Sequence, residues 1–289
     1  MSEPTLDRVA QLAAALDDDG FSLSPADLQQ VAASAPAPLI DTLLPSQAVV
    51  TLAGPPGIGK SFVTLSWAAS VATGQPWHGL AVAGSQPVAY VLGEGWSQFG
   101  RRVAAWEQVH GPMSPLLRFI DGSRHGVDLC DPEVTSWLIG KLAAFRPALV
   151  VLDTFSMLAH VQSENDNAQV AGVFRSVRRI VSQTGATVVV VHHMAKESGK
   201  VRGATAFRGN SDTVVVAAPS RVEGDSTFVL STHASDDGKQ RDGEPVALTG
   251  FEIVSPGIVA RSTAVSARQL IGDQMAAIMQ KPIPAPTTQ

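Results

Sequence analysis

The stretch from Gly54 to Ser61 constrains this chain more than any other, because it fits the pattern GxxxxGK[ST] at every fixed position. Glycines let backbone N–H groups converge on a phosphate, Lys60 reaches the β- and γ-phosphates, and the Ser61 hydroxyl completes the shell of a Mg²⁺ ion. An apolar strand at 48–53 and an apolar helix at 62–72 flank the loop as this motif requires. We therefore expect ATP and Mg²⁺ to be bound by Gly54, Pro55, Pro56, Gly57, Ile58, Gly59, Lys60 and Ser61.

Composition limits the class of protein. The 289 residues, 45% of them hydrophobic, fit one α/β domain with short extensions, and no apolar run approaches the ~20 residues of a membrane span. Without a basic-then-apolar leader the sequence predicts a cytoplasmic protein with no membrane partner. The one cysteine, Cys130, excludes an internal disulfide, and we expect it to be a buried small hydrophobe. A net charge of −5 argues against a broad nucleic-acid-coating face, although a narrow basic channel remains compatible with it.

Strands and helices alternate over 39–262, which predicts an α/β fold with a mostly parallel sheet flanked by helices. The expected strands of this part are 48–53, 87–92, 116–120, 148–152 and 187–191. The expected helices are 60–73, 97–109, 132–145 and 167–183. After 210 the pattern changes to short strands with tight turns, which predicts an antiparallel extension at 213–217, 226–232, 246–254 and 257–261.

The two ends of the chain differ from this domain. Residues 1–38 read as a helical arm, with a second short helix capped at Ser24 and a Pro-rich linker, and such an arm suits docking to a replication partner. Residues 263–289 read as a last helix and a disordered tail.

Two strands end in carboxylates. Asp153 closes the apolar strand 148–152, where it can hold the Mg²⁺ shell beside the phosphate loop. Glu94 closes the strand at 87–92. If that strand neighbours the phosphate-loop strand, Glu94 faces the γ-phosphate as a general base. Periodicity equally allows a carboxylate that merely stabilises the start of the next helix.

His192 and His193 end another strand at the same sheet edge, where a polar side chain can contact the γ-phosphate. A loop at 194–210 follows. It carries four cations against one acid and has one aromatic residue, Phe207, so it predicts contact with a nucleic-acid backbone rather than base stacking. The alternative is an ordinary solvated loop. The expected single-stranded-DNA-binding residues are Lys196, Lys200 and Arg202.

Together these residues resemble the RecA-type P-loop ATPases, and within them the RepA-type hexameric replicative helicases of plasmids, with DnaB-type helicases as cousins. The resemblance covers roughly 40–260. It rests on linked motifs: GPPGIGKS, YVLGEG, VVLDT, VVVVHH and AFRGNSD.

The resemblance implies roles for several of these residues. Glu94 takes the position of the catalytic glutamate, the two histidines match the switch motif, and the 194–209 loop matches the second DNA-binding loop of the channel. Arg208, in AFRG, matches the arginine that reaches into the neighbouring subunit.

A second candidate for that role is the segment 238–243, which resembles the KxR element with Lys239 and Arg241. Its alternative is a charged hairpin tip, and the sequence does not decide between Arg208 and this pair. Arg101 and Arg102, in the helix after the glutamate, match no family role.

The sequence thus predicts an enzyme, a DNA-acting, ATP-hydrolysing RecA-like motor: a replicative helicase or a related phage or plasmid ATPase, assembled as a homo-oligomeric ring, a hexamer. The alternatives are a P-loop kinase of a small molecule and a nucleotide-dependent oligomeric switch.

Overall fold

The computed structural model divides the chain into two compact units, Met1–Ala37 and Pro38–Gln289. It describes residues 23–193, 204–222, 226–241, 243–255 and 257–261. In the first unit, helix α2 (Pro25–Ala33) begins as predicted at Ser24, whose hydroxyl accepts a hydrogen bond from the Asp27 N–H at 3.2 Å. The Asp27 carboxylate accepts the Ser24 N–H at 3.0 Å in return, so both ends of this capping box are satisfied. The predicted first arm helix and C-terminal helix lie outside the described residues.

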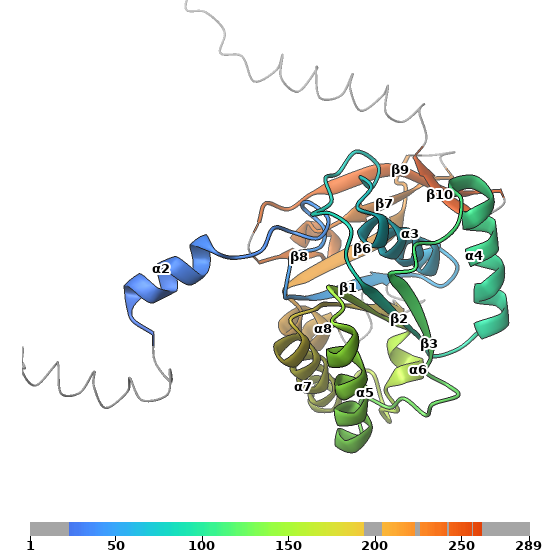
Figure 1. Ribbon diagram of the computed structural model, residues 1–289. Helices are drawn as coiled ribbons and strands as arrows, with labels where there is room; N and C mark the ends of the chain where they lie inside the picture. The colour runs from blue at the N-terminus through green and yellow to red at the C-terminus, as the bar shows by residue number, and fades with distance from the viewer. Residues whose placement is uncertain (1–22, 194–203, 223–225, 242, 256, 262–289) are drawn as a thin grey trace, which may run out of the picture. The chain divides into compact units, whose positions relative to one another are not determined.

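Ten described strands form one sheet in the second unit (Figure 1), in the order β10-β9-β7-β6-β1-β5-β4-β2-β3, with β8 paired to β6. The predicted parallel part is confirmed for β1 to β5, and a sixth strand joins it, in the order β6-β1-β5-β4-β2-β3. The sequence predicted β6 as part of the antiparallel extension, but this strand pairs with β1 in parallel, and only its other edge is antiparallel. The bounds of these six strands are β1 Val49–Gly54, β2 Val88–Leu92, β3 Leu117–Asp121, β4 Leu149–Asp153, β5 Thr187–His193 and β6 Thr213–Pro219.

The expected antiparallel extension is also present on one side of β6. It consists of β7 Phe228–Ser231, β8 Lys239–Gln240, β9 Ala247–Val254 and β10 Ile258–Arg261.

Helices cover both faces of this sheet (Figure 1). Because side chains alternate along a strand, Val50 and Leu52 of β1 enter one core while Val49 and Ala53 enter the other. The first core is shared with α3 (Lys60–Thr73) and α4 (Trp96–His110). The second is shared with α5 (Pro132–Phe145), α6 (Phe155–Leu158), α7 (Asn167–Thr184) and α8 (Ala204–Asn210).

Two further expectations are wrong in detail. Residues 204–210, predicted as the end of a loop, form α8. Phe207 of this segment is fully buried and contacts the rings of Phe155 and Phe174, and this apolar burial offsets the entropy that is lost when the segment becomes ordered. Cys130 is exposed, because it lies in the turn whose Asp128 carboxylate accepts the Cys130 N–H just before α5. None of the described helices is long and apolar enough to cross a membrane.

Candidate nucleotide-binding site

A cavity of about 370 Å³ lies at the carboxyl ends of the parallel strands, the edge at which the sequence places the phosphate loop. The strand register explains the convergence, since Gly54 of β1 is level with His193 of β5, and Leu92 of β2 with Asp153 of β4. The cavity is lined by Gly57, Gly59, Lys60, Ser61, Phe62, Leu92, Glu94, Gly95, Gln98, Phe99, Arg102, Asp153, Thr154 and His193.

The backbone of the phosphate loop requires its glycines at two places. Gly59 has φ 101°, in the left-handed region, and directly precedes α3. At Gly54 an added Cβ would lie 2.6 Å from the Ala217 carbonyl oxygen of β6, so only glycine allows the loop to leave the sheet here. The first turn of α3, with Lys60, Ser61 and Phe62, lines the cavity, and a helix N-terminus in this place suits an anion.

The Lys60 side chain is held by the backbone of the phosphate loop. Its Nζ donates to the carbonyl oxygens of Gly54 at 2.8 Å and Pro55 at 3.0 Å, and lies 3.0 Å from Nδ1 of His193. Only 5% of the residue is exposed. Burial lowers the pKa of Lys60 to about 8, and the nearby Asp153 carboxylate opposes this shift. The ammonium is thus poorly solvated and would gain strongly from a phosphate anion.

Asp153 is buried and held by two hydroxyl groups. Tyr90, the only tyrosine of the chain, donates to its Oδ2 at 2.6 Å, and Ser61 also hydrogen-bonds to the side chain. The Tyr90 hydroxyl in turn lies 2.7 Å from the Thr64 hydroxyl of α3. Burial raises the pKa of Asp153, which the hydrogen bonds and the positive charges of Arg102 and Lys60 counteract. The Ser61 hydroxyl and this carboxylate are oxygen ligands of the kind Mg²⁺ prefers, so the residues fit the ion.

Glu94 also lines the cavity, but not for the reason considered from sequence. Strand β2 does not neighbour β1, because β5 and β4 lie between them. Glu94 reaches the site because it follows β2 by two residues and is exposed toward the cavity, before α4 begins at Trp96. The position is compatible with a general base acting across the bound phosphates.

The two histidines lie on opposite sides of β5. His193 faces the phosphate loop through its contact with Lys60. His192 is 1% exposed and stacks on Phe207 of α8, with ring centroids 3.7 Å apart and planes 16° apart. Of the pair, only His193 lines the cavity, and His192 links the same strand to α8.

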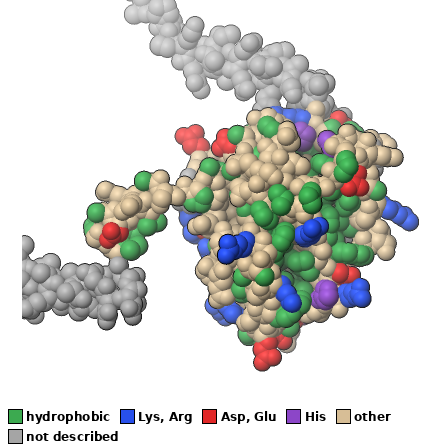
Figure 2. Space-filling view, in the orientation of Figure 1, with side chains coloured by type: hydrophobic (Ala, Val, Ile, Leu, Met, Phe, Trp, Pro, Cys, Tyr) green, Lys and Arg blue, Asp and Glu red, His purple; other side chains and the backbone are tan. Residues whose placement is uncertain are grey.

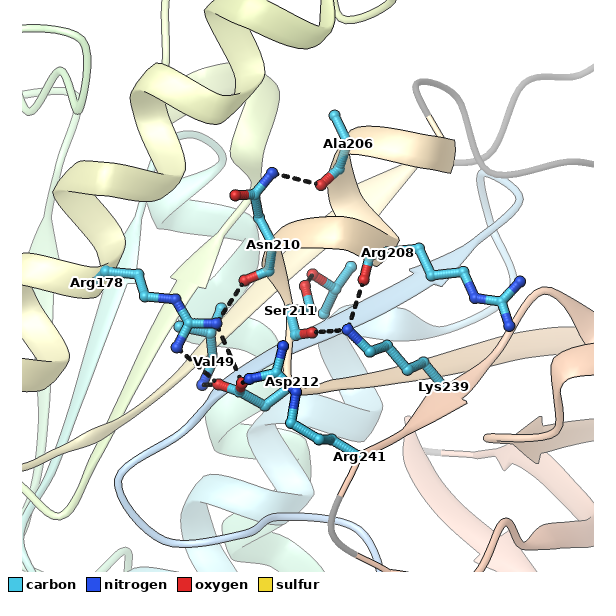
Figure 3. Close-up of polar contacts among 10 residues, drawn as sticks. Val49, Arg178, Ala206, Arg208, Asn210, Ser211, Asp212, Lys239 and Arg241 are labelled. Carbon is cyan, nitrogen blue, oxygen red and sulfur yellow. Dashed lines mark hydrogen bonds and ion pairs between the residues drawn. The ribbon is translucent and has the colours of Figure 1, made fainter. Parts of the chain in front are cut away.

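The three candidate trans residues, Arg208, Lys239 and Arg241, line no part of this cavity. They gather where β6 begins, at the opposite end of the strands (Figure 3). Lys239 Nζ donates to the carbonyl oxygens of Arg208 at 2.9 Å and Ser211 at 2.6 Å. Arg241 is paired with Asp212 at 2.6 Å.

Asp212 is the centre of this cluster. Its carboxylate also accepts the Val49 N–H at 2.9 Å and two hydrogen bonds from Arg178, both at 3.1 Å. The hydrogen bonds and charges of the arginines lower the pKa of Asp212 against the opposing effect of burial. Arg208 differs from the others in direction, since its side chain extends away from the cluster in Figure 3.

Some predicted residues cannot be placed and others were missed. Lys196, Lys200 and Arg202 lie outside the described residues. Tyr90 and Arg102 were not assigned to the site. For Arg102 a signal was present: Gly95, Gln98, Phe99 and Arg102 follow helical spacing and all line the cavity.

Comparisons with known proteins identify a family and a fold. A family model described as an AAA domain matches residues 15–199, well over half of the chain. The chain belongs to the AAA domain family. This AAA domain protein is similar in structure to a KaiC-like protein from the hyperthermophilic archaeon Pyrococcus horikoshii OT3, with a TM-score of 0.53 over 77% of this chain and 93% of that chain. At 15% identity the likeness concerns the fold, which is that of the RecA-type P-loop ATPases.

Proposed function

We propose that this AAA domain protein hydrolyses ATP at the interfaces of a head-to-tail homo-oligomeric ring, expected to be a hexamer, and uses the energy to move single-stranded DNA, as a replicative helicase does. The observation that carries the proposal is the cavity itself. It brings Lys60, Ser61, Asp153 and Glu94 together from three separate segments of the chain.

The roles follow from this geometry. Lys60 exchanges the Gly54 and Pro55 carbonyl oxygens for phosphate oxygens, which are stronger partners because they are charged. Ser61 and Asp153 hold Mg²⁺, which when bound neutralises charge on the phosphates. Glu94 orients the attacking water and accepts its proton. His193, in contact with Lys60, responds to the terminal phosphate.

For the residue that acts on the neighbour's nucleotide we favour Arg208 over Lys239 and Arg241. The Lys239 ammonium already donates to two backbone carbonyl oxygens. The Arg241 guanidinium already donates to the Asp212 carboxylate. No described residue accepts a hydrogen bond from the Arg208 guanidinium, which is exposed. Lys239 donates to the Arg208 carbonyl instead, so it fixes the end of the helix from which the Arg208 side chain extends.

Mixed rings test this assignment. Arg208→Ala subunits should bind ATP, since their own cavity is intact. They should not hydrolyse it, because no neighbouring subunit supplies the arginine. Mixing them equally with Glu94→Gln subunits should restore hydrolysis at about a quarter of the interfaces, where an intact Glu94 meets an intact Arg208 in a head-to-tail ring. ATP turnover against mixing ratio is the measurement. If mixed rings form and no activity returns, Arg208 does not act in trans.

Movement of DNA rests on the cations at 194–210 rather than on a basic surface. On the face shown in Figure 2 the lysine and arginine side chains are scattered, with no continuous basic patch. This distribution fits the net charge of −5 and favours a local contact in a ring channel over a broad one.

ATP turnover with and without single-stranded DNA tests the DNA-dependent part. DNA should stimulate turnover, and the triple substitution Lys196→Ala, Lys200→Ala, Arg202→Ala should weaken DNA binding and flatten its salt dependence, because fewer counterions are released. Basal turnover should change much less. Turnover that ignores DNA, with an unaltered salt slope, would favour a nucleotide-dependent switch. ATP consumption that requires a small-molecule acceptor would favour a kinase.

A further inference from the structure

Arg102 is a cation of the cavity for which the proposed roles leave no function. It lies on α4, two turns after the helix begins, and it lines the cavity together with the phosphate loop. Its neighbour Arg101 is exposed and does not line the cavity. The two arginines therefore differ in position although they are adjacent in sequence.

Two aromatic rings hold the Arg102 guanidinium in place. Its central carbon lies 4.9 Å from the centroid of the Phe62 ring and 5.6 Å from that of Phe99. Phe62 directly follows Ser61 in the first turn of α3, so the guanidinium is anchored beside the helix end that meets the phosphates. Stacking uses the faces of a guanidinium and leaves the N–H groups at its edge available, in the fork that matches phosphate oxygens.

The charges of the cavity favour a second phosphate contact. Its lining residues include two acids, Glu94 and Asp153, and the cations Lys60 and Arg102. The positive charge of Arg102 acts on Asp153, as that of Lys60 does, so both cations lie within electrostatic reach of the same metal-binding carboxylate. A triphosphate adds several negative charges at this point, more than Lys60 alone can balance. No described residue accepts a hydrogen bond from the Arg102 side chain.

We propose that Arg102 is a further nucleotide-binding residue, which contacts the terminal phosphate of ATP from the α4 side of the cavity while Lys60 contacts it from the loop. The inference rests on the proposed ATP site and adds a means by which that site distinguishes ATP from ADP. A residue that contacts only the terminal phosphate distinguishes ATP from ADP. Product release is then favoured, because ADP lacks the group that Arg102 holds.

The test compares affinities for ADP and for a non-hydrolysable β,γ-imido analogue of ATP, measured by calorimetry with Mg²⁺ present. Arg102→Met keeps an apolar stem against Phe62 and Phe99 but loses the charge. It should weaken binding of the analogue about tenfold or more, as expected for a charge-assisted hydrogen bond, and change ADP binding by less than about threefold. Arg102→Lys should recover part of the loss, since it keeps the charge without the planar fork. Arg101→Met is the matched control and should bind both nucleotides as the unaltered protein does.

Three outcomes overturn the inference. Unchanged affinity for both nucleotides in Arg102→Met means no contact, and equal losses for both mean contact with a part of the nucleotide that ATP and ADP share. Equal losses in the Arg101 and Arg102 variants mean a general effect of the helix charge. If the unaltered protein binds neither nucleotide, the ATP site fails first, which separates that failure from this one.

Discussion

Replacing Glu94 by glutamine should leave ATP and Mg²⁺ bound and slow hydrolysis by about two or more orders of magnitude, the effect expected for loss of a general base. Glutamine has nearly the same size and keeps the hydrogen-bonding oxygen, but it does not accept the proton of the attacking water. Glu94 lines the cavity but is not part of the phosphate loop, so its replacement should lower turnover and leave the affinity for ATP unchanged. Turnover and nucleotide affinity are measured on the same preparation.

Glu133→Gln supplies the control for this variant. Glu133 lies in the first turn of α5, is exposed, and lines no part of the cavity. Glu133→Gln removes only a helix-end carboxylate, so we expect it to lower the free energy of unfolding by a fraction of about 1 kcal/mol and to leave turnover unchanged. If Glu94→Gln behaved in the same way, Glu94 would be a helix-end carboxylate and the base would have to be sought elsewhere.

Lys60→Ala should abolish ATP binding or turnover, because the only cation within the phosphate loop is lost. Lys141→Ala, which removes an exposed lysine of α5, should retain both. Equilibrium binding of ATP and steady-state turnover are the measurements. Full hydrolysis by Lys60→Ala would contradict the assignment of the phosphate loop.

The pKa of Lys60 adds a second readout to this experiment. With a pKa of about 8 in the free protein, the ammonium has already lost part of its proton at pH 8 to 9, and phosphate anions raise the pKa again. ATP binding should therefore take up about half a proton near pH 8, and progressively less as the pH falls below 7. Calorimetry in two buffers of different ionisation enthalpy measures this uptake. Proton uptake that persists in a Lys60 variant that still binds ATP would place the titrating group elsewhere.

Much of the fold could be predicted from the sequence because local signals agreed with burial. The helix expected at 132–145 is α5 at the same bounds, since Asp131 caps it, with its carboxylate accepting the Glu133 N–H, and Pro132 suits the first turn. The strand ends were equally readable. A polar residue after an apolar run, such as Asp153, marks the edge at which parallel strands converge.

Contacts between distant segments could not be predicted in the same way. The sequence carries no sign that two strands separate β2 from β1, so the route by which Glu94 reaches the cavity was misjudged. Arg241 read as a finger or a hairpin tip because its partner, Asp212, is 29 residues away and has no local pattern. Phe207 read as a loop aromatic because its stacking partner, His192, belongs to another element.

The tandem histidines of β5 carry a consequence for how the chain tolerates change. Neighbouring side chains of a strand point to opposite faces, so positions 192 and 193 have different surroundings. His192 stacks on an aromatic ring, whereas His193 contacts a lysine ammonium. In a saturation library, position 192 should accept flat apolar rings and reject small polar residues, whereas position 193 should show the reverse preference. A deletion of one residue earlier in the strand would exchange the two positions and fail at both, so the spacing is constrained as strongly as the residue types.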